Sequence, residues 1–141
     1  MQVVLDTNVL HSGLLSATGA SREILHLVDE GVITPVVSVP LVLEYESVLK
    51  RKEFLQEVGL SPREVNAIVD YIISRAHLQQ INFLWRSFLP DPKDDCVLEC
   101  AVNGRAQIIL TFNKRHFPAV QRQFGVAVFT PGEFLRTVRG Y

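Results

Sequence analysis

Acidic and amide side chains follow apolar stretches of this chain at several separate places. Asp6 comes directly after the run Val3–Leu5, and Asn113 comes soon after a run that ends at Thr111. Open α/β sheets bind their ligands in the crevice beyond the carboxyl ends of the strands, where such side chains would meet. We therefore expect one acidic pocket assembled from distant segments. The candidate residues for it are Asp6, Glu44, Asp94, Asp95 and Asn113.

A cluster of carboxylates favours a bound divalent cation. Neighbouring carboxylates repel one another unless a cation or protons neutralise them, and Mg²⁺ and Mn²⁺ prefer hard oxygen ligands. A purely structural role is open for some of these residues, because Asp6, Asp94 or Asp95 could do no more than cap a helix. The residues alone leave both roles open.

The helical periodicity around Glu44 does not single out this residue. At about 100° per residue, Glu44 lies near Val48 at one border of the apolar stripe. Glu46 lies equally near Val42 at the other border. Periodicity alone cannot choose which of the two glutamates faces the pocket.

Apolar runs alternate with helical patterns along the chain, which indicates a mainly parallel sheet covered by helices on both faces. The predicted strands are 3–5, 34–38, 106–111 and 126–129. The predicted helices are one around 24–28 that Gly31 ends, one at 40–49 that the basic run 50–52 ends, and three more at 61–80, 94–101 and 131–138. Pro90 and Pro92 are expected to break the chain before the helix at 94–101.

Composition indicates one soluble domain. The 141 residues are 48% hydrophobic, which is enough for a substantial core, so we expect a single domain over 1–141. The formal net charge of -1 means that nucleic-acid binding would need a local basic patch. We expect no membrane span and a cytoplasmic protein, with Cys96 and Cys100 as reduced, packed thiols.

Four separated stretches resemble, in order and spacing, the four signature regions of PIN-domain ribonucleases. They are VVLDTNVL at 3–10, EYESVLKR at 44–51, DPKDDCVLECA at 91–101 and TFNKRHF at 111–117. Within that family, the chain is most similar to bacterial toxin components related to the VapC toxins. The resemblance covers essentially the whole chain and implies a three-layer α/β/α sandwich with an acidic pocket at the carboxyl edge of the sheet.

The same resemblance assigns roles to the acidic residues. Asp6, Glu44 and Asp95 match the family's first three acids, so they are the expected ligands of Mg²⁺ or Mn²⁺. Asp94 is the neighbour of Asp95 in an acidic pair, and Asn113 stands where many members carry a fourth acid. Because Asn113 leaves one fewer negative charge, a second metal would be held less firmly.

Other residues are expected to support the site. Thr7, Asn8 and Thr111 could orient the carboxylates or a water, or could make ordinary turn and cap hydrogen bonds. The histidines show no metal-ligand spacing, so no catalytic histidine is expected. The candidates for contacts to an RNA backbone are Lys50, Arg51, Lys52, Lys114, Arg115 and His116, although solvated helix ends also attract basic residues.

The function that the resemblance implies is a metal-dependent endoribonuclease that hydrolyses RNA phosphodiester bonds, as the toxin of a toxin–antitoxin pair. It also implies a small antitoxin partner and a homodimer. The alternative is a PIN-like module that binds RNA or protein with little or no cleavage.

Two other classes with an acidic pocket fit less well. A haloacid-dehalogenase-like phosphatase needs a second Asp two residues after the first, where this chain has Asn8. A receiver domain does not accommodate the long helix at 61–80 or the acidic pair at 94–95.

Overall fold

A parallel sheet of five strands lies at the centre of the protein. The computed structural model describes residues 1–82, 89–91 and 94–139. The sheet has the order β3-β2-β1-β4-β5, and each pair of neighbouring strands is parallel. The strands are β1 (Gln2–Leu5), β2 (Thr34–Val37), β3 (His77–Leu78), β4 (Ile108–Leu110) and β5 (Ala127–Phe129).

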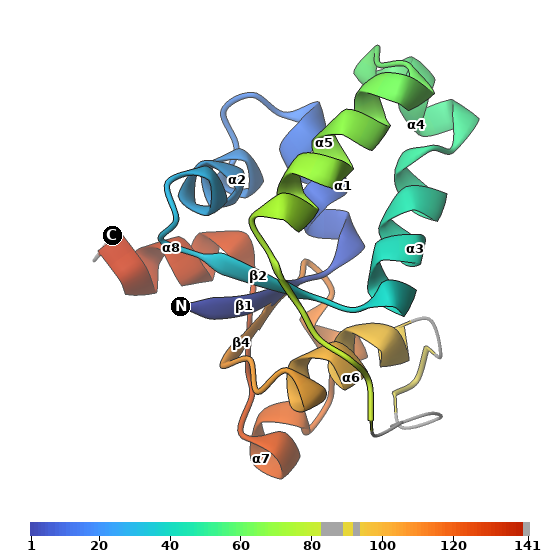
Figure 1. Ribbon diagram of the computed structural model, residues 1–141. Helices are drawn as coiled ribbons and strands as arrows, with labels where there is room; N and C mark the ends of the chain where they lie inside the picture. Colours follow the sequence, from blue (N-terminus) through green and yellow to red (C-terminus); the bar gives the residue numbers. More distant parts are fainter. Residues whose placement is uncertain (83–88, 92–93, 140–141) are drawn as a thin grey trace.

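Helices cover both faces of this sheet, which confirms the expected three-layer α/β/α sandwich. In Figure 1, α1 (Thr7–Leu15), α2 (Ala20–Asp29) and α5 (Pro62–Ser74) lie above β1 and β2, and α6 (Asp95–Asn103) and α7 (Val120–Phe124) lie below. The remaining helices are α3 (Val39–Leu49), α4 (Lys52–Val58), α8 (Pro131–Arg139) and the 3₁₀ turn η2 (Lys114–His116).

The central strands are apolar along their length because helices bury both of their faces. Val3, Val4 and Leu5 of β1 have no exposed surface, and neither have Ile109 and Leu110 of β4. A strand buried on both sides reads as a continuous apolar run rather than an alternating one. This burial explains why the sequence reveals β1 and β4 so clearly.

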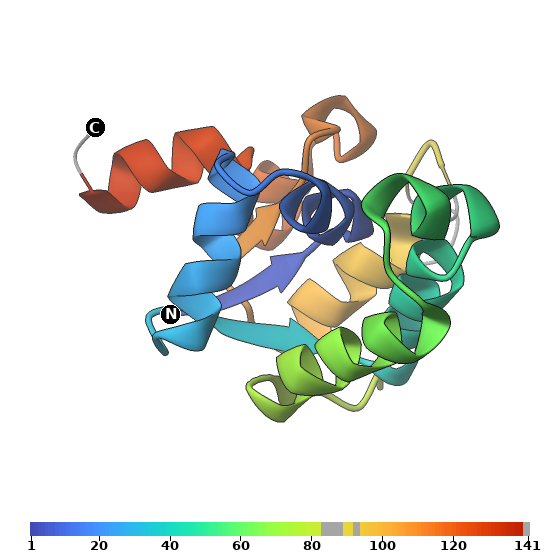
Figure 2. The same cartoon turned by 90° about the horizontal axis from the view of Figure 1, so that it is seen from above.

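The chain reverses its direction of travel across the sheet between β1 and β4. From β1 it moves outward to β2 and β3, and it then returns to place β4 on the other side of β1. Leu5 is in register with Leu110, and the Asp6 amide donates to the Leu110 carbonyl at 2.9 Å. A reversal of this kind leaves a crevice at the carboxyl ends of the two strands. Seen from above, β1 and β2 run from the N-terminus toward the side where α1 and α3 begin (Figure 2).

The structure corrects two expectations about the middle of the chain. The helix predicted at 61–80 ends at Ser74, and the next residues form β3, a fifth strand that the sequence did not reveal. The backbone of this short segment pairs with β2, and the Gln79 amide donates to the Val37 carbonyl at 2.7 Å. Pairing with β2 therefore takes the place of the last part of the predicted helix, after Ser74.

The basic run 50–52 does not simply end a helix. Lys50 is the C-cap of α3, Arg51 is the N-cap of α4, and Lys52 begins α4. Arg51 therefore lies at the junction of the two helices, which matters for the site below. Pro92, expected to break the chain, lies outside the described residues. Within the described ranges, no helix combines the length and apolarity needed to cross a membrane.

Candidate active site

Asp6 is fixed at the end of β1 by hydrogen bonds to both of its carboxylate oxygens. One oxygen accepts from the Thr7 amide at 2.7 Å, and the other accepts from the Thr111 hydroxyl at 2.7 Å. Asp6 is therefore the N-cap of α1, which is the structural role that the sequence left open for this residue. The bond from Thr111 goes beyond capping, because it joins the ends of two neighbouring strands at the reversal point of the sheet.

Thr111 is the centre of a small polar network around Asp6. Its hydroxyl oxygen accepts from the Asn113 amide at 3.0 Å and has a longer contact of 3.4 Å with the Asn8 side-chain amide. The side-chain carbonyl oxygen of Asn8 in turn accepts from the Phe112 backbone amide at 3.3 Å. Thr111 has no exposed surface, so this network holds the segment after β4 against the start of α1. These bonds fit the predicted orienting role of Asn8 and Thr111, and they fit ordinary turn hydrogen bonding as well.

Glu44 is positioned by its neighbour Tyr45. The Tyr45 ring is buried, and its hydroxyl donates to the Leu5 carbonyl at 2.5 Å. This bond fixes α3 against the last residue of β1, one residue before Asp6. Glu44 then faces the pocket and Glu46 is not among the residues that line it, which answers the question that periodicity left open.

The acidic pair at the start of α6 divides into one residue that faces the pocket and one that does not. Asp94 occupies the N-cap position, but its side chain makes no capping hydrogen bond, and it lines the pocket. Asp95 is 2% exposed, and its carboxylate accepts from the Leu89 amide at 3.2 Å. The geometry therefore favours Asp94 over Asp95 as the third acid of the site.

The pocket at the strand ends has a volume of about 380 Å³, large enough for a nucleotide-sized group. It brings together residues from four separate segments of the chain. Its acidic and amide lining side chains are Asp6, Glu44, Asp91, Asp94 and Asn113, and its basic ones are His11, Arg51 and His116. Thr7 and Asn8 also line it. Four of the five acidic and amide candidates from the sequence thus meet here.

Two aspartates of the pocket, Asp6 and Asp94, are harder to ionise than ordinary aspartates. Burial raises the pKa of Asp6 above its ordinary value, the charge of Glu44 adds to this, and the bonds from Thr111 and Thr7 oppose it. Burial, together with the charges of Asp6 and Asp91, raises the pKa of Asp94 to about 6, against the opposing effect of His116. A site whose carboxylates raise one another's pKa values is one that a cation would stabilise.

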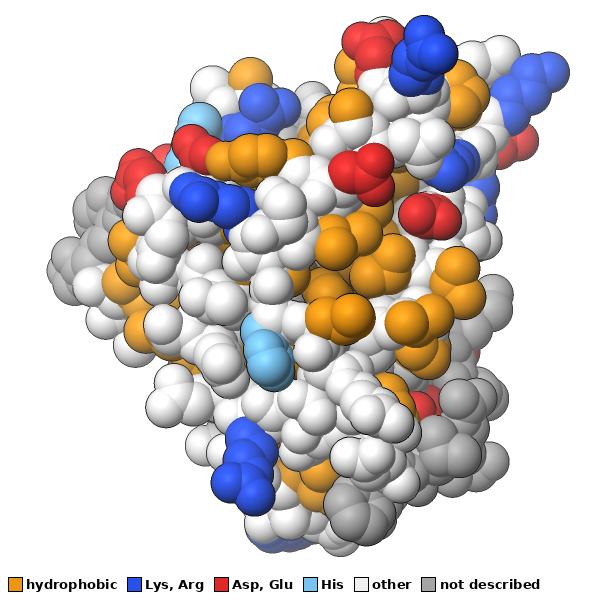
Figure 3. Space-filling view, in the orientation of Figure 1, with side chains coloured by type: hydrophobic (Ala, Val, Ile, Leu, Met, Phe, Trp, Pro, Cys, Tyr) orange, Lys and Arg blue, Asp and Glu red, His pale blue; other side chains and the backbone are white. Residues whose placement is uncertain are grey.

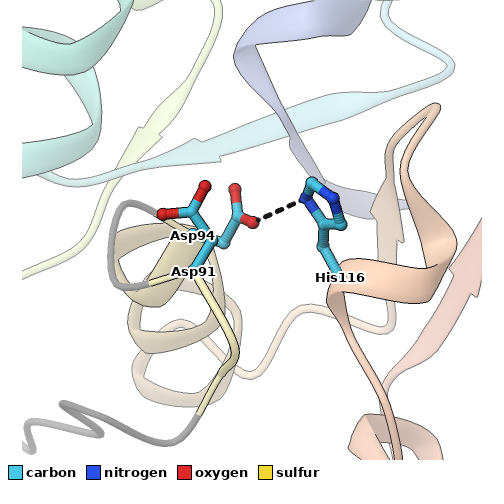
Figure 4. A group of neighbouring side chains, drawn as sticks. All are labelled: Asp91, Asp94 and His116. Carbon is cyan, nitrogen blue, oxygen red and sulfur yellow. Dashed lines mark hydrogen bonds and ion pairs between the residues drawn. The ribbon is translucent and has the colours of Figure 1, made fainter.

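Sequence reasoning did not place three polar residues in the pocket: Asp91, His11 and His116. The His116 Nδ1 atom lies 3.1 Å from a carboxylate oxygen of Asp94, and Figure 4 shows the imidazole pointing toward the two aspartates. One ligand atom from each of Asp91, Asp94 and His116 lies within 4.8 Å of the others. A search for histidine pairs at short spacing could not find this group, because His116 comes from a different element from the two aspartates.

Most of the basic candidates lie away from the pocket. Arg51 lines it, whereas Lys50, Lys52 and Arg115 are not among its lining residues. Lys114 forms an ion pair of 3.1 Å with Glu133 at the surface. Arg51 is therefore the candidate best placed to meet a phosphate next to the carboxylates. In the part of the chain that the structure describes, Cys96 and Cys100 form no disulfide, as expected.

Comparison with known families decides the classification. A family model described as the PIN domain matches residues 2–115, which contain the strand ends and all the acidic residues of the pocket. The chain belongs to the PIN-domain family. The match runs through β4 and the segment after it, so the four stretches singled out in the sequence all fall within or overlap the PIN domain.

A search of curated proteins finds no match to this PIN domain. Among solved structures, it is similar to a chain of VapBC2 from Rickettsia felis, crystallised with a DNA fragment from the promoter. The TM-score is 0.59 at 13% sequence identity, and the similarity covers 91% of this chain and 97% of that chain. At this identity the likeness establishes the fold, which agrees with the family assignment.

Proposed function

We propose that this PIN domain is a metal-dependent endoribonuclease that hydrolyses RNA phosphodiester bonds. The observation that carries the proposal is the convergence of Asp6, Glu44 and Asp94 on one pocket, although they come from three distant segments. Each is held by a specific contact: the Thr111 bond for Asp6, the bond of the neighbouring Tyr45 for Glu44, and the contact with His116 for Asp94.

The donor set of the pocket fits a divalent cation. Carboxylate and carboxamide oxygens are the ligands that Mg²⁺ and Mn²⁺ prefer. Burial first, and then neighbouring carboxylates, raise the pKa values of Asp6 and Asp94, and a bound cation would favour the charged form of both. We propose Asp6, Glu44 and Asp94 as the ligands, with Asn113 beside them. When bound, such an ion lowers the pKa of a water and polarises the phosphodiester for in-line attack.

The chain's own groups hold and orient the reactants. Thr111 and Thr7 fix the Asp6 carboxylate in one orientation, so that its position does not depend on the substrate. Arg51 lines the same pocket and offers its guanidinium to a phosphate of the substrate. Asn113 carries an amide where a fourth acid would add charge, and it can accept or donate a hydrogen bond to the substrate.

A cleavage assay with matched acid-to-amide variants tests this proposal. Purified protein should cleave a single-stranded RNA with Mn²⁺ or Mg²⁺ and should stop when EDTA is added. Asp6→Asn and Asp94→Asn should each reduce cleavage by about a hundredfold or more, because each removes a ligand charge. Asp95→Asn is the matched control, since the amide oxygen can still accept from Leu89. Cleavage that survives chelation, or that Asp6→Asn leaves unchanged, would contradict the proposal.

A toxin role is the biological form of this activity that we propose. The similar Rickettsia felis structure is of VapBC2 bound to a promoter DNA fragment, and by analogy we propose a small antitoxin as the partner of this chain. Val39 and Leu43 of α3 and Leu78 of β3 are each more than half exposed. Figure 3 shows hydrophobic side chains gathered on the face that carries α3 and α5, and we propose this surface for the antitoxin or a second copy of the chain.

Growth of cells that express the chain alone, and together with its neighbouring small reading frame, tests the toxin role. Arrest by the chain alone, relieved by the second product and by Asp6→Asn, supports it. No arrest with active nuclease in the extract would contradict the toxin role and leave the nuclease standing. RNA binding without cleavage in the presence of Mn²⁺ would favour the alternative, a PIN-like binding module.

A further inference from the structure

His116 is held over the pocket by the backbone turn that follows Asn113. The His116 amide donates to the Asn113 carbonyl at 2.9 Å and closes the turn η2. The next residue, Phe117, is 4% exposed and anchors the turn in the core. The imidazole therefore reaches the pocket from a fixed support, three residues beyond the position where an acid is replaced by Asn113.

Asp94 and Asp91 lie against this imidazole. The Asp94 carboxylate lies 3.1 Å from the His116 Nδ1 atom, and it does not cap α6. Asp91 adds a second carboxylate oxygen within 4.8 Å of these atoms. All three side chains are partly exposed to the pocket rather than sealed in the core. Figure 4 shows them converging from the segment before α6 and from η2.

The spacing of these atoms suits coordination as well as hydrogen bonding. Metal–ligand bonds of about 2.1 Å place neighbouring ligands of an octahedral ion about 3.0 Å apart. The distance of 3.1 Å between His116 and Asp94 matches such an edge. One ligand atom from each of the three residues lies within 4.8 Å of the other two. Small side-chain rotations would therefore bring the three atoms around one ion.

We propose that His116, Asp94 and Asp91 form a metal subsite for a divalent transition-metal ion such as Mn²⁺, with Asp94 shared with the proposed Asp6 and Glu44 ligands. Imidazole binds Mn²⁺, Fe²⁺, Co²⁺ and Zn²⁺ well, whereas Mg²⁺ prefers oxygen ligands alone. His116 thus adds a nitrogen ligand to a site in which Asn113 takes the place of an acid, and it shifts the site's preference from Mg²⁺ to Mn²⁺. This inference rests on the proposed metal-dependent function.

Pulsed EPR of Mn²⁺ bound to the tag-free protein tests the subsite without reference to activity. Wild type should show nitrogen coupling from a coordinated imidazole. His116→Ala should lose this coupling and bind Mn²⁺ about tenfold or more weakly by calorimetry, with Mg²⁺ affinity little changed. His26→Ala is the matched control, because His26 is an exposed histidine on α2 that does not line the pocket, and it should keep both signals.

His116→Asn separates a ligand from a residue that only orients Asp94. An asparagine can still donate a hydrogen bond to Asp94, so a positioning role predicts wild-type Mn²⁺ affinity in this variant. A ligand role predicts loss of the nitrogen coupling and weaker Mn²⁺ binding in both His116 variants. Thermal melts of the metal-free proteins identify any variant that fails to fold, and the asparagine variant then carries the test alone.

Absence of nitrogen coupling in wild type, or coupling that persists in His116→Ala, would overturn the subsite. The nuclease proposal is judged separately. Cleavage by wild type without nitrogen coupling would leave the nuclease standing and remove the subsite. Nitrogen coupling that depends on His116, in a protein that cleaves no RNA, would support the subsite and contradict the nuclease.

Discussion

The Thr111 hydroxyl donates a hydrogen bond of 2.7 Å to the Asp6 carboxylate and so joins the ends of β4 and β1. The two residues are adjacent in space because Leu5 and Leu110 are in register in neighbouring parallel strands. Thr111 favours the charged form of Asp6, and it opposes the burial that raises the pKa of this carboxyl. The charged form of Asp6, at the centre of the pocket, is therefore stabilised by a residue that is distant in the sequence.

Replacing Thr111 by Val should move metal binding to higher pH. Without the hydroxyl, the pKa of Asp6 rises further, so more alkaline conditions are needed to free the carboxylate for a cation. We expect the pH at half-maximal Mn²⁺ binding to rise by about one unit. Thr111→Ser keeps the donor and should behave as wild type, and Thr137→Val on α8 is a surface control. An unchanged pH dependence in Thr111→Val would show that the bond does not tune Asp6.

Tyr45→Phe should lower stability and activity together. The variant removes the 2.5 Å bond to the Leu5 carbonyl, which fixes α3 beside the Asp6 end of β1. We expect the free energy of unfolding in urea to fall by about 1–2 kcal/mol. RNA cleavage should fall as well, because Glu44 loses its fixed position. Tyr71 is an exposed residue of α5, and Tyr71→Phe is the control. It removes a surface bond to Asp29 and should change the free energy of unfolding by less than about 0.5 kcal/mol.

The metal-free protein should lose stability as the pH rises from about 4 to 7. The pKa of Asp94 is raised from 3.8 to about 6 in the folded state by burial and by Asp6 and Asp91, against the opposing effect of His116. The folded state therefore binds this proton more tightly than the unfolded state does. The resulting stability is complete below pH 3.8 and is lost as the pH passes through about 6.

Asp94→Asn isolates this contribution. The variant cannot ionise at position 94, so in EDTA at pH 7 its free energy of unfolding should exceed that of wild type by about 1–2 kcal/mol, after allowance for solvent screening. Near pH 4 the two proteins should be equally stable. Urea denaturation at both pH values measures the difference. A variant less stable than wild type at pH 7 would mean that Asp94 contributes a net favourable contact in the absence of metal.

Asn113→Asp should strengthen metal binding. The substitution adds a carboxylate to a pocket already lined by Asp6, Glu44 and Asp94. One more charge about 4 Å from a divalent ion favours Mn²⁺ binding by about tenfold at a partly solvated site. Calorimetry with Mn²⁺ measures the change, and Asn103→Asp, on α6 away from the pocket, controls for net charge. Equal affinities in wild type and Asn113→Asp would mean that position 113 does not contact the ion.

The strand ends were predictable from the sequence because fully buried parallel strands produce unbroken apolar runs. The positions of Asp6 and Asn113 at the pocket follow from these runs alone. The third acid could not be chosen in this way, since Asp94 and Asp95 are consecutive and tertiary contacts separate their roles, among them the bond from the Leu89 amide to Asp95 and the contact of Asp94 with His116. Glu44 was likewise distinguished from Glu46 by a tertiary contact, that of the buried Tyr45 hydroxyl.

The features that the sequence did not reveal depend on pairing between distant segments. The short strand β3 exists because the edge of β2 supplies partners, and its two residues have no strong strand pattern of their own. His116 reaches Asp94 through a turn after β4, so no local spacing connects them. The one available sign was its place in the stretch 111–117, where the chain carries Asn113 in place of an acid.

A crystal of the protein soaked in Mn²⁺, with an anomalous difference map, measures most directly whether the pocket is a metal centre. We expect a strong peak bounded by the carboxylates of Asp6, Glu44 and Asp94, with the Asp95 carboxylate still bonded to the Leu89 amide. The same soak of Asp6→Asn crystals should lose that peak. An empty pocket at saturating Mn²⁺, or a peak coordinated by Asp95 in place of Asp94, would contradict the metal site described for this PIN domain.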